Sequence, residues 1–357
     1  MKKLQDSFTI RQTKIGNRVC IPPLVIMTNS DEEGFAAPAA VAHYTALARG
    51  GAGLVIQEAT CVSPEGKLRA HQIGLWRDEH IPGNRAIAEA VHQLGTPIFM
   101  QIHHAGVVAM SDTLLCPSAY SAQVDGKLKQ GRAMTGKEIE ATQEHFIQAG
   151  IRAWKAGYDG VELHGCHSYL LCQFFNSRIN RREDQYCDAM NFVEPIIQGI
   201  RQGTDSRFVI GIRLGCFEPT LKEGIAHAVA LEKAGVDFID VSGGFAGESD
   251  PIKPEAFPYH EFVYGAGEIK KAVNVPVFAV NSICTPEQAQ GALEATNVDM
   301  VDIGRSALVD SDWPRKALAG EKPGKCLHCA VCQWRIDPQK CAGRRLMERE
   351  RREKEKE

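Results

Sequence analysis

The sequence predicts an α/β protein, a closed (β/α)8 TIM barrel with a C-terminal cysteine-rich extension. Eight short apolar runs alternate with helical patterns along the chain, which is the element order of such a barrel. The runs are apolar almost throughout, as expected for parallel strands that helices cover. A doubly wound open sheet is the alternative. It is less favoured because no G-x-G-x-x-G motif follows the first run.

Each element of the barrel has a local signal. Thr135 with Glu138 has the spacing of a capping box, and Thr285 precedes a proline at the first helical position. The expected strands are residues 18–27, 53–59, 97–104, 160–165, 208–215, 238–243, 276–281 and 300–304. The expected helices are residues 39–49, 84–94, 137–156, 191–202, 225–234, 267–272 and 286–294. The glycines expected to end helices in a left-handed conformation are Gly50, Gly95, Gly157 and Gly235.

Composition excludes several classes of protein. The chain has 357 residues and a formal net charge of −3, so it lacks the basic footprint of a nucleic-acid-binding protein. No run reaches the roughly 18 apolar residues of a membrane helix. The stretch from Met1 to Asp6 has basic residues but no apolar segment behind it, so no signal peptide is predicted and a cytoplasmic location is expected.

Three segments are expected along the chain. Residues 1–320 form the barrel, residues 321–343 the cysteine-rich extension, and residues 344–357 a charged tail that is a frayed helix or disordered. Residues 106–134, after the third strand, form a long loop that is large enough to be a lid or a substrate wall. A homo-oligomer is compatible with the sequence, which does not fix the oligomeric state.

The expected fourth strand ends in two histidines and a tyrosine, His164, His167 and Tyr169. Parallel β/α barrels place their chemistry at the C-terminal ends of the strands. Two neutral imidazoles can hold a carbonyl or phenolate oxygen, and a nearby phenol can protonate a carbanion. The alternative is a pair of capped surface histidines beside a packed tyrosine.

Two other strand ends carry polar side chains that suit a flat, polar ring. Gln101 can both donate and accept a hydrogen bond there. Arg213 places a guanidinium inside an apolar run, and a buried arginine needs an anionic or strongly accepting partner, such as a reduced flavin ring. A polar strand-end cap for Gln101 and a structural salt bridge for Arg213 are the alternatives.

The ends of the seventh and eighth strands predict a phosphate site. Asn281 and Ser282 follow the seventh strand, and Gly304 and Arg305 follow the eighth. The loops at these two positions are the usual phosphate site of the barrel, where backbone N–H groups and a helix N-terminus face the anion. Arg305 adds a charge that can bind a phosphate with two hydrogen bonds.

Four of the twelve cysteines lie close together near the C-terminus. Cys326, Cys329 and Cys332 are spaced as C-x2-C-x2-C, and Cys341 follows. This pattern resembles the ligation of a [4Fe-4S] cluster. Four thiolates could also hold a structural zinc ion, although zinc sites usually combine two separated C-x2-C pairs.

Together these residues resemble the old yellow enzyme family of FMN-dependent oxidoreductases, over about residues 17–319. The phosphate loop and the terminal cysteines resemble most closely the branch of 2,4-dienoyl-CoA reductase and trimethylamine dehydrogenase, whose members carry a [4Fe-4S] cluster after the barrel. The segments that carry the resemblance are Asn17-Arg18-Val19, Pro22-Pro23, His43-Tyr44, Glu58-Ala59, Gln101 with His104-Ala105-Gly106, His164 with His167-Ser168-Tyr169-Leu170, Arg213, and Gly304-Arg305.

The resemblance implies roles for these residues. The segment Pro23, Leu24 and Val25 runs along the flavin, Ala59 lines the ring, and Gln101 and Arg213 hold it. The Gly304-Arg305 pair holds the FMN phosphate, with Asn281 and Ser282 in the facing loop. His164 and His167 hold the activating oxygen of the substrate, and Tyr169 donates a proton to its α-carbon. Val25 stands where relatives often have Thr or Cys, and Asn281 replaces a glycine.

The expected activity is therefore reduction of an activated C=C bond, in an α,β-unsaturated carbonyl compound or an enoyl thioester. Long relatives carry further domains that deliver electrons to the flavin. In this chain, electrons are therefore expected from NAD(P)H directly or from a separate donor protein. An amine dehydrogenase of the trimethylamine dehydrogenase type and a non-catalytic, zinc-stapled barrel are the alternatives.

Overall fold

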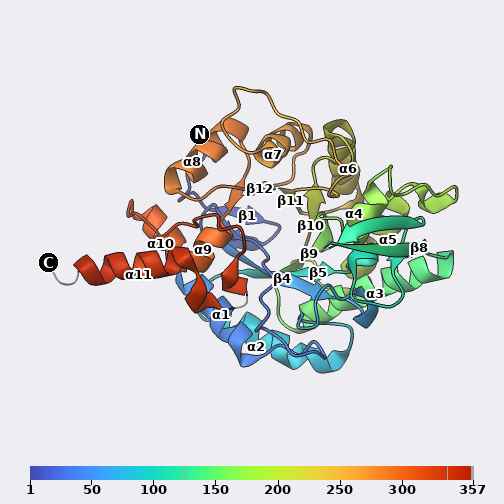
Figure 1. Ribbon diagram of the computed structural model, residues 1–357, viewed down its shortest axis with the longest axis horizontal. Helices are drawn as coiled ribbons and strands as arrows, with labels where there is room; N and C mark the ends of the chain where they lie inside the picture. Colours follow the sequence, from blue (N-terminus) through green and yellow to red (C-terminus); the bar gives the residue numbers. More distant parts are fainter. Residues whose placement is uncertain (125, 336, 355–357) are drawn as a thin grey trace.

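A closed barrel of eight parallel strands forms the centre of the computed structural model, which describes residues 1–124, 126–335 and 337–354. Each strand pairs with the next along the chain, and the last pairs with the first. Figure 1 shows the helices arranged around these strands. The barrel strands are β3 Val19–Ile21, β4 Leu54–Cys61, β5 Ile98–His103, β9 Gly160–Gly165, β10 Val209–Gly215, β11 Phe238–Ser242, β12 Val277–Ala279 and β13 Met300–Asp302. All eight lie within or beside the predicted runs, so the predicted fold class is confirmed.

The seven predicted helices are all present, with ends shifted by a few residues. Both predicted threonine caps form capping boxes, at Thr135 and Thr285. The largest shift is at α7, which begins six residues early because His260 caps its N-terminus. The helices are α1 Pro38–Arg49, α2 Ile81–His92, α3 Gly136–Lys155, α5 Met190–Gly203, α6 Leu221–Ala234, α7 Glu261–Ala272 and α8 Pro286–Thr296.

Three of the four glycines predicted to be left-handed have a positive φ: Gly95, Gly157 and Gly235. The prediction for Gly50 is wrong, since its φ is −66° and the left-handed residue is the next one, Gly51, with a φ of 83°. Gly50 therefore keeps a helical backbone conformation, and the chain turns at Gly51.

The lower half of the barrel interior is filled with apolar side chains. The rings of Phe99, Phe238 and Phe278 stack across three strands, with centroids 5.4 Å and 4.8 Å apart. The hairpin formed by β1 (Phe8–Ile10) and β2 (Thr13–Ile15) closes this end, and its Ile10 and Ile15 pack into the same cluster. Because the lower half is packed, polar side chains inside the barrel gather toward the C-terminal ends of the strands.

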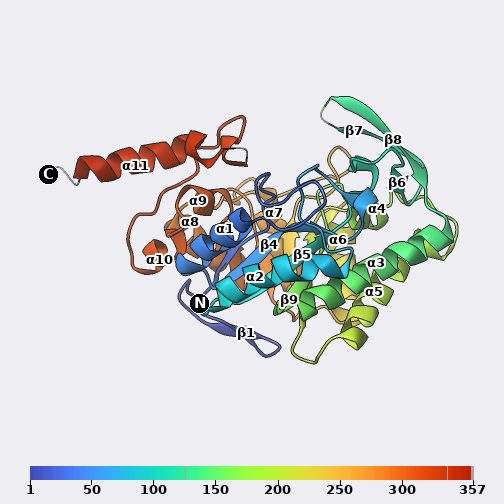
Figure 2. The same ribbon diagram turned by 90° about the horizontal axis from the view of Figure 1, so that it is seen from below.

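The segment 106–134, predicted as a long loop, contains regular structure. It holds the strands β6 Leu115–Cys116, β7 Tyr120–Val124 and β8 Lys127–Ala133, which form a small sheet in the order β6-β8-β7. In Figure 2, β7 and β8 project from the side of the barrel opposite β1. This is the side where the barrel strands end, so the segment is placed to form a wall of the site.

Three further helices were not predicted: α4 Leu170–Phe175, α9 Arg305–Val309 and α10 Trp313–Leu318. After α10 the chain crosses toward α1 and α9, where Trp334 packs with Ile26 and Leu308. Much of the predicted charged tail lies in the helix α11, Ala342–Lys354, which extends away from the barrel (Figure 2). The last three tail residues lie outside the described residues. Within the described part of the chain, no helix is long and apolar enough to cross a membrane.

Candidate active site

The turn after β9 brings His164, His167 and Tyr169 together. His167 and Ser168 both have a left-handed backbone, with φ values of 58° and 66°. The turn is held by two hydrogen bonds, from the His167 N–H to the Gly243 carbonyl (3.0 Å) and from the Ala246 N–H to the Ser168 hydroxyl (2.8 Å). These contacts to the loop after β11 stabilise a backbone conformation that non-glycine residues rarely adopt.

The side chains of this turn face one another. His164 Nε2 lies 3.1 Å from His167 Nδ1, and the Tyr169 ring stands edge-on to His164 with centroids 4.7 Å apart. His167 Nε2 lies 2.8 Å from the Ser242 hydroxyl at the end of β11. Tyr169 is also the residue that precedes α4. The three predicted catalytic residues therefore form one cluster at the C-terminal end of the barrel.

A third histidine, His103 at the end of β5, belongs to the same cluster. Its Nδ1 lies 3.1 Å from His164 Nδ1, and its ring lies edge-on to Tyr169 with centroids 4.5 Å apart. The sequence analysis missed it. The period of two along a strand places His103 on the same face as Gln101, and this signal could have found it. His104 points elsewhere, and its Nδ1 accepts a hydrogen bond from the Gly106 N–H.

Burial keeps the inner histidines neutral. The pKa values of His103 and His164 are held well below the ordinary value, mainly because burial disfavours the charged ring. A neutral imidazole has one donor and one acceptor nitrogen. The row from His103 through His164 and His167 to Ser242 can therefore pass hydrogen bonds from ring to ring, which fixes the orientation of each ring.

Gln101 on β5 and Arg213 on β10 lie on the two strands that flank β9 in the barrel. Gln101 Nε2 donates to Glu162 Oε1 at 2.7 Å. Arg213 is 5% exposed, and its Nε lies 3.1 Å from Asp240 Oδ2 without the alignment of a hydrogen bond. Its NH2 group lies 3.7 Å from Asp302. A buried guanidinium with an unused N–H fits the anionic edge of a reduced flavin ring.

The three acids near Arg213 are all buried. Burial is the main cause that raises the pKa values of Glu162, Asp240 and Asp302, and the nearby Arg213 charge opposes this effect in all three. The structural salt bridge that was the alternative for Arg213 is thus partly formed, with Asp240 and Asp302. It does not exclude a ligand, because the guanidinium has further N–H donors besides the Nε that faces Asp240.

The segment Pro23–Val25 is half-buried. Glu58 fixes the backbone just after it, at Ile26. The Glu58 carboxylate accepts hydrogen bonds from the Ile26 N–H (3.0 Å) and the Asn29 side chain (2.6 Å). Ala59 follows Glu58 in β4 and is buried. Glu58 is therefore the anchor of this segment.

The predicted phosphate residues meet at the ends of β12 and β13. Asn281 and Ser282 have φ values of 102° and 58°, and Arg305 is the first residue of α9. A side chain on Gly304 would come within 3.3 Å of Pro22 and 3.5 Å of Leu24. The close approach of Gly304 to Pro22 and Leu24 and the exposed Arg305 give the segment Pro23–Val25 a basic end, which fits the phosphate of FMN.

The four C-terminal cysteines lie on the loop between α10 and α11. Cys332 and Cys341 pack beside Trp334, and Arg305 and Cys332 contribute to the electrostatic environment of Cys326. In the described chain, no three of these sulfur atoms gather within 4.8 Å of one another. A tetrahedral zinc site needs sulfur atoms about 3.8 Å apart, so the described cysteines are not drawn together as such a site.

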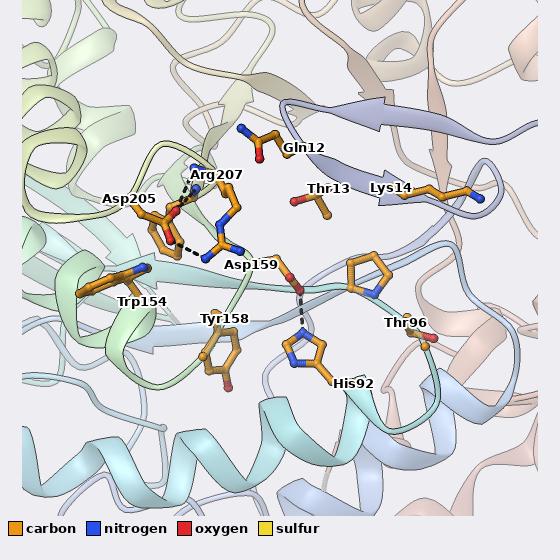
Figure 3. Close-up of a pocket in the computed structure, with 14 residues that line it drawn as sticks. Gln12, Thr13, Lys14, His92, Thr96, Trp154, Tyr158, Asp159, Asp205 and Arg207 are labelled. Atoms are coloured by element: carbon orange, nitrogen blue, oxygen red, sulfur yellow. Dashed lines mark hydrogen bonds and ion pairs between the residues drawn. The ribbon is translucent and has the colours of Figure 1, made fainter.

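Two cavities lie away from these residues. One, of about 590 Å³, is at the N-terminal end of the barrel, where Figure 3 shows His92 bonded to Asp159 and Arg207 to Asp205. The other, of about 760 Å³, lies between α1, α9 and α11. Neither is lined by the predicted catalytic residues.

The comparisons with known proteins identify the family of this chain. Residues 3–322 match the NADH:flavin oxidoreductase / NADH oxidase family. The chain belongs to this family. It is 39% identical over 337 residues to an NADH oxidase of Thermoanaerobacter brockii, covering 89% of this chain and 51% of that protein. It is 32% identical over 322 residues to an NADPH dehydrogenase of a Geobacillus species, covering 88% and 93%.

A solved structure shows the shared fold of this family. The old yellow enzyme homologue from Zymomonas mobilis superposes with a TM-score of 0.76 at 22% identity, covering 94% of this chain and 99% of that chain. The chain spans about half the length of the Thermoanaerobacter relative. The family is one of NADH:flavin oxidoreductases, and the two relatives are named for the oxidation of NADH and of NADPH.

Proposed function

We propose that this flavoprotein reduces the activated C=C bond of an α,β-unsaturated carbonyl compound or an enoyl thioester. The observation that carries the proposal is the convergence of His164, His167 and Tyr169 on one turn at the barrel's C-terminal end. Two hydrogen-bond donors beside one proton donor match the two places where such a substrate changes its charge, the carbonyl oxygen and the α-carbon.

His164 and His167 would hold the substrate oxygen. The oxygen would take the place of the contact between His164 Nε2 and His167 Nδ1. As the β-carbon is reduced, negative charge develops on that oxygen, and N–H donors aimed at it stabilise the charge. His103 and Ser242 hold the two rings in place at 3.1 Å and 2.8 Å. Because burial keeps His164 neutral, it acts as a hydrogen-bond donor rather than as a cation.

Tyr169 would donate its phenolic proton to the α-carbon. Its ring is held edge-on between His103 and His164, with centroids at 4.5 Å and 4.7 Å. A positioned proton donor contributes about 10²–10⁴-fold to a rate. Amine oxidation requires no proton at a carbon atom, so the presence of Tyr169 in the cluster favours ene reduction over the amine dehydrogenase alternative.

The FMN cradle would consist of Pro23, Leu24, Val25 and Ala59 along the ring, Gln101 and Arg213 at its polar edge, and Asn281, Ser282, Gly304 and Arg305 at the phosphate. When bound, FMN supplies the hydride from its ring nitrogen N5. The chain's own contribution is to orient the ring and to place the unused Arg213 donor where negative charge gathers.

Cys326, Cys329, Cys332 and Cys341 would hold a [4Fe-4S] cluster. The C-x2-C-x2-C spacing with a remote fourth cysteine supports this over a zinc staple, because zinc sites usually combine two separated C-x2-C pairs. Arg305 and Cys326 influence one another electrostatically, so the cluster and the FMN phosphate would be neighbours. A separate electron-donor protein could then deliver electrons through the cluster, or NAD(P)H could reduce the flavin directly.

Half-reaction kinetics test the proposal. Protein that has been reduced anaerobically is mixed in a stopped-flow instrument with 2-cyclohexenone, with an enoyl-CoA, or with cyclohexanone as the saturated control. We expect rapid reoxidation by at least one unsaturated compound and none by cyclohexanone. If no unsaturated compound reoxidises the protein, and trimethylamine instead reduces the oxidised form, the amine dehydrogenase alternative is correct.

A further inference from the structure

A cysteine that the proposed reaction does not use lies between the two substrate histidines. Cys166 is fully buried, and its Sγ lies 3.2 Å from His167 Nδ1. The same nitrogen lies 3.1 Å from His164 Nε2. The three atoms, two imidazole nitrogens and one sulfur, all lie within 4.8 Å of one another.

We propose that His164, Cys166 and His167 form a binding site for Zn²⁺, with one coordination position left open. Imidazole nitrogen and thiolate sulfur are the ligands that zinc prefers, and three protein ligands with an open position are typical of accessible zinc sites. A tetrahedral site with these ligands requires separations of about 3.3–3.6 Å between donor atoms. The observed 3.1 Å and 3.2 Å need only a small opening of the turn.

The surroundings orient the two histidines as metal ligands require. A ligating histidine usually has its second ring nitrogen bound to another group, which fixes the direction of the first. Here the second nitrogen of His164 faces His103 at 3.1 Å, and that of His167 faces Ser242 at 2.8 Å. The backbone bonds of the turn to Gly243 and Ala246 hold all three ligands in one rigid segment.

Some of the charges around the site oppose a bound cation, and others favour it. The Arg213 guanidinium influences both His164 and Cys166 and opposes a cation. The carboxyl groups of Glu162 and Asp240 influence Cys166 with the opposite sign and offset part of this repulsion. Binding converts the Cys166 thiol into a zinc-bound thiolate and releases its proton to solvent, so that charge and atoms balance without a redox step.

The metal and the substrate oxygen would need the same two histidines. Zn²⁺ bound at His164 Nε2 and His167 Nδ1 removes the donors that the proposed function assigns to the substrate. We therefore expect Zn²⁺ to compete with substrates and with phenols, an expectation that rests on the proposed function. The binding of Zn²⁺ itself depends only on the three ligands.

The test uses the FMN-loaded protein and two measurements. Equilibrium dialysis counts bound Zn²⁺ in wild type, in Cys166→Ala and in Cys116→Ala, a matched loss of a buried cysteine on β6. A titration with p-hydroxybenzaldehyde, with and without Zn²⁺, reports on the histidines alone, because zinc at the C-terminal cysteines would not displace it. His167→Ala removes a second ligand and checks the result if Cys166→Ala is poorly folded.

We expect Cys116→Ala to behave as wild type, and Cys166→Ala and His167→Ala to lose roughly tenfold or more in affinity for one Zn²⁺ per chain. In wild type, Zn²⁺ should displace the phenol competitively. Equal zinc binding by wild type, Cys166→Ala and His167→Ala would overturn the site. If the phenol does not bind at all while zinc binding still depends on Cys166, the zinc site stands and the proposed oxygen site fails.

Discussion

Arg305 is the residue on which FMN retention should depend most directly. It begins α9 at the end of β13, and its side chain is exposed beside the close backbone at Gly304. Arg305→Ala removes a charge-assisted hydrogen bond to the phosphate, worth roughly 1.5–3 kcal/mol. We expect the variant to lose FMN on dialysis, as measured by flavin absorbance per chain. Arg315→Ala on α10 is the matched control, and equal flavin retention by all three proteins would refute the phosphate assignment.

Glu218 gives a second residue-scale prediction, for stability rather than binding. It accepts hydrogen bonds from Asn176 (2.7 Å) and Cys172 (3.2 Å), yet burial raises its pKa from 4.5 to about 7. A raised carboxyl pKa stabilises the fold below pH 4.5, and this stability is lost as the pH rises through 7.

Glu218→Gln keeps the shape and removes the titration. The free energy of unfolding of the variant, relative to wild type, should therefore increase between pH 5 and pH 8, by up to roughly 3 kcal/mol. Urea unfolding at the two pH values measures this, with the exposed Glu140→Gln on α3 as control. A difference that does not change with pH would show that Glu218 is ionised throughout.

The contacts of His103 in the site could not be predicted from the sequence. The strand that carries it was predicted, and its alternation places His103 on the same face as Gln101, but that pattern does not say which side chains His103 contacts. Contact with His164 arises because β5 and β9 are neighbours in the barrel. Only the pairing of two strands some sixty residues apart shows that the three histidines form one row.

At the scale of elements, the barrel strands and helices could be predicted because each has a local signal: apolar runs, threonine caps and terminal glycines. The hairpin of β7 and β8 could not be predicted in the same way, because most of its residues are exposed and show no apolar face. Its sequence does contain Asp125-Gly126 between the two strands, a dipeptide typical of hairpin turns, and this signal was overlooked. The hairpin is held by Tyr120, which donates to Glu248 at 2.8 Å.

The cysteine-rich segment supplies the element-scale prediction. Anaerobically prepared protein should contain about four iron atoms and four acid-labile sulfides per chain. Cys326→Ser should lose both and destabilise the segment between α10 and α11, because metal binding and local folding are coupled. Cys187→Ser, at an exposed cysteine before α5, should keep both. Zinc without sulfide in the wild-type protein would show that the cysteines hold a structural zinc ion and not the cluster.

At the scale of the whole molecule, the candidate active site is assembled from strands that are far apart in the sequence. Gln101, His164, Arg213 and Arg305 come from β5, β9, β10 and the end of β13, and they meet because parallel strands end on one face of a barrel. This rule is why the sequence could predict the site. No local pattern predicts how the extension packs, and the tilted contact of Trp334 with His43, with ring centroids 5.4 Å apart, is visible only in the structure.

The central claim is that Tyr169 protonates the α-carbon while His164 and His167 hold the oxygen. Tyr169→Phe tests it most directly, because phenylalanine keeps the packing of the ring against His103 and His164 and removes only the proton. The measurement is stopped-flow reoxidation of pre-reduced protein by an enone that the wild type accepts. We predict reoxidation slower by about 10²–10⁴-fold, with phenol binding and reduction by NAD(P)H nearly unchanged. Reoxidation of Tyr169→Phe at the wild-type rate with every accepted enone would contradict the account.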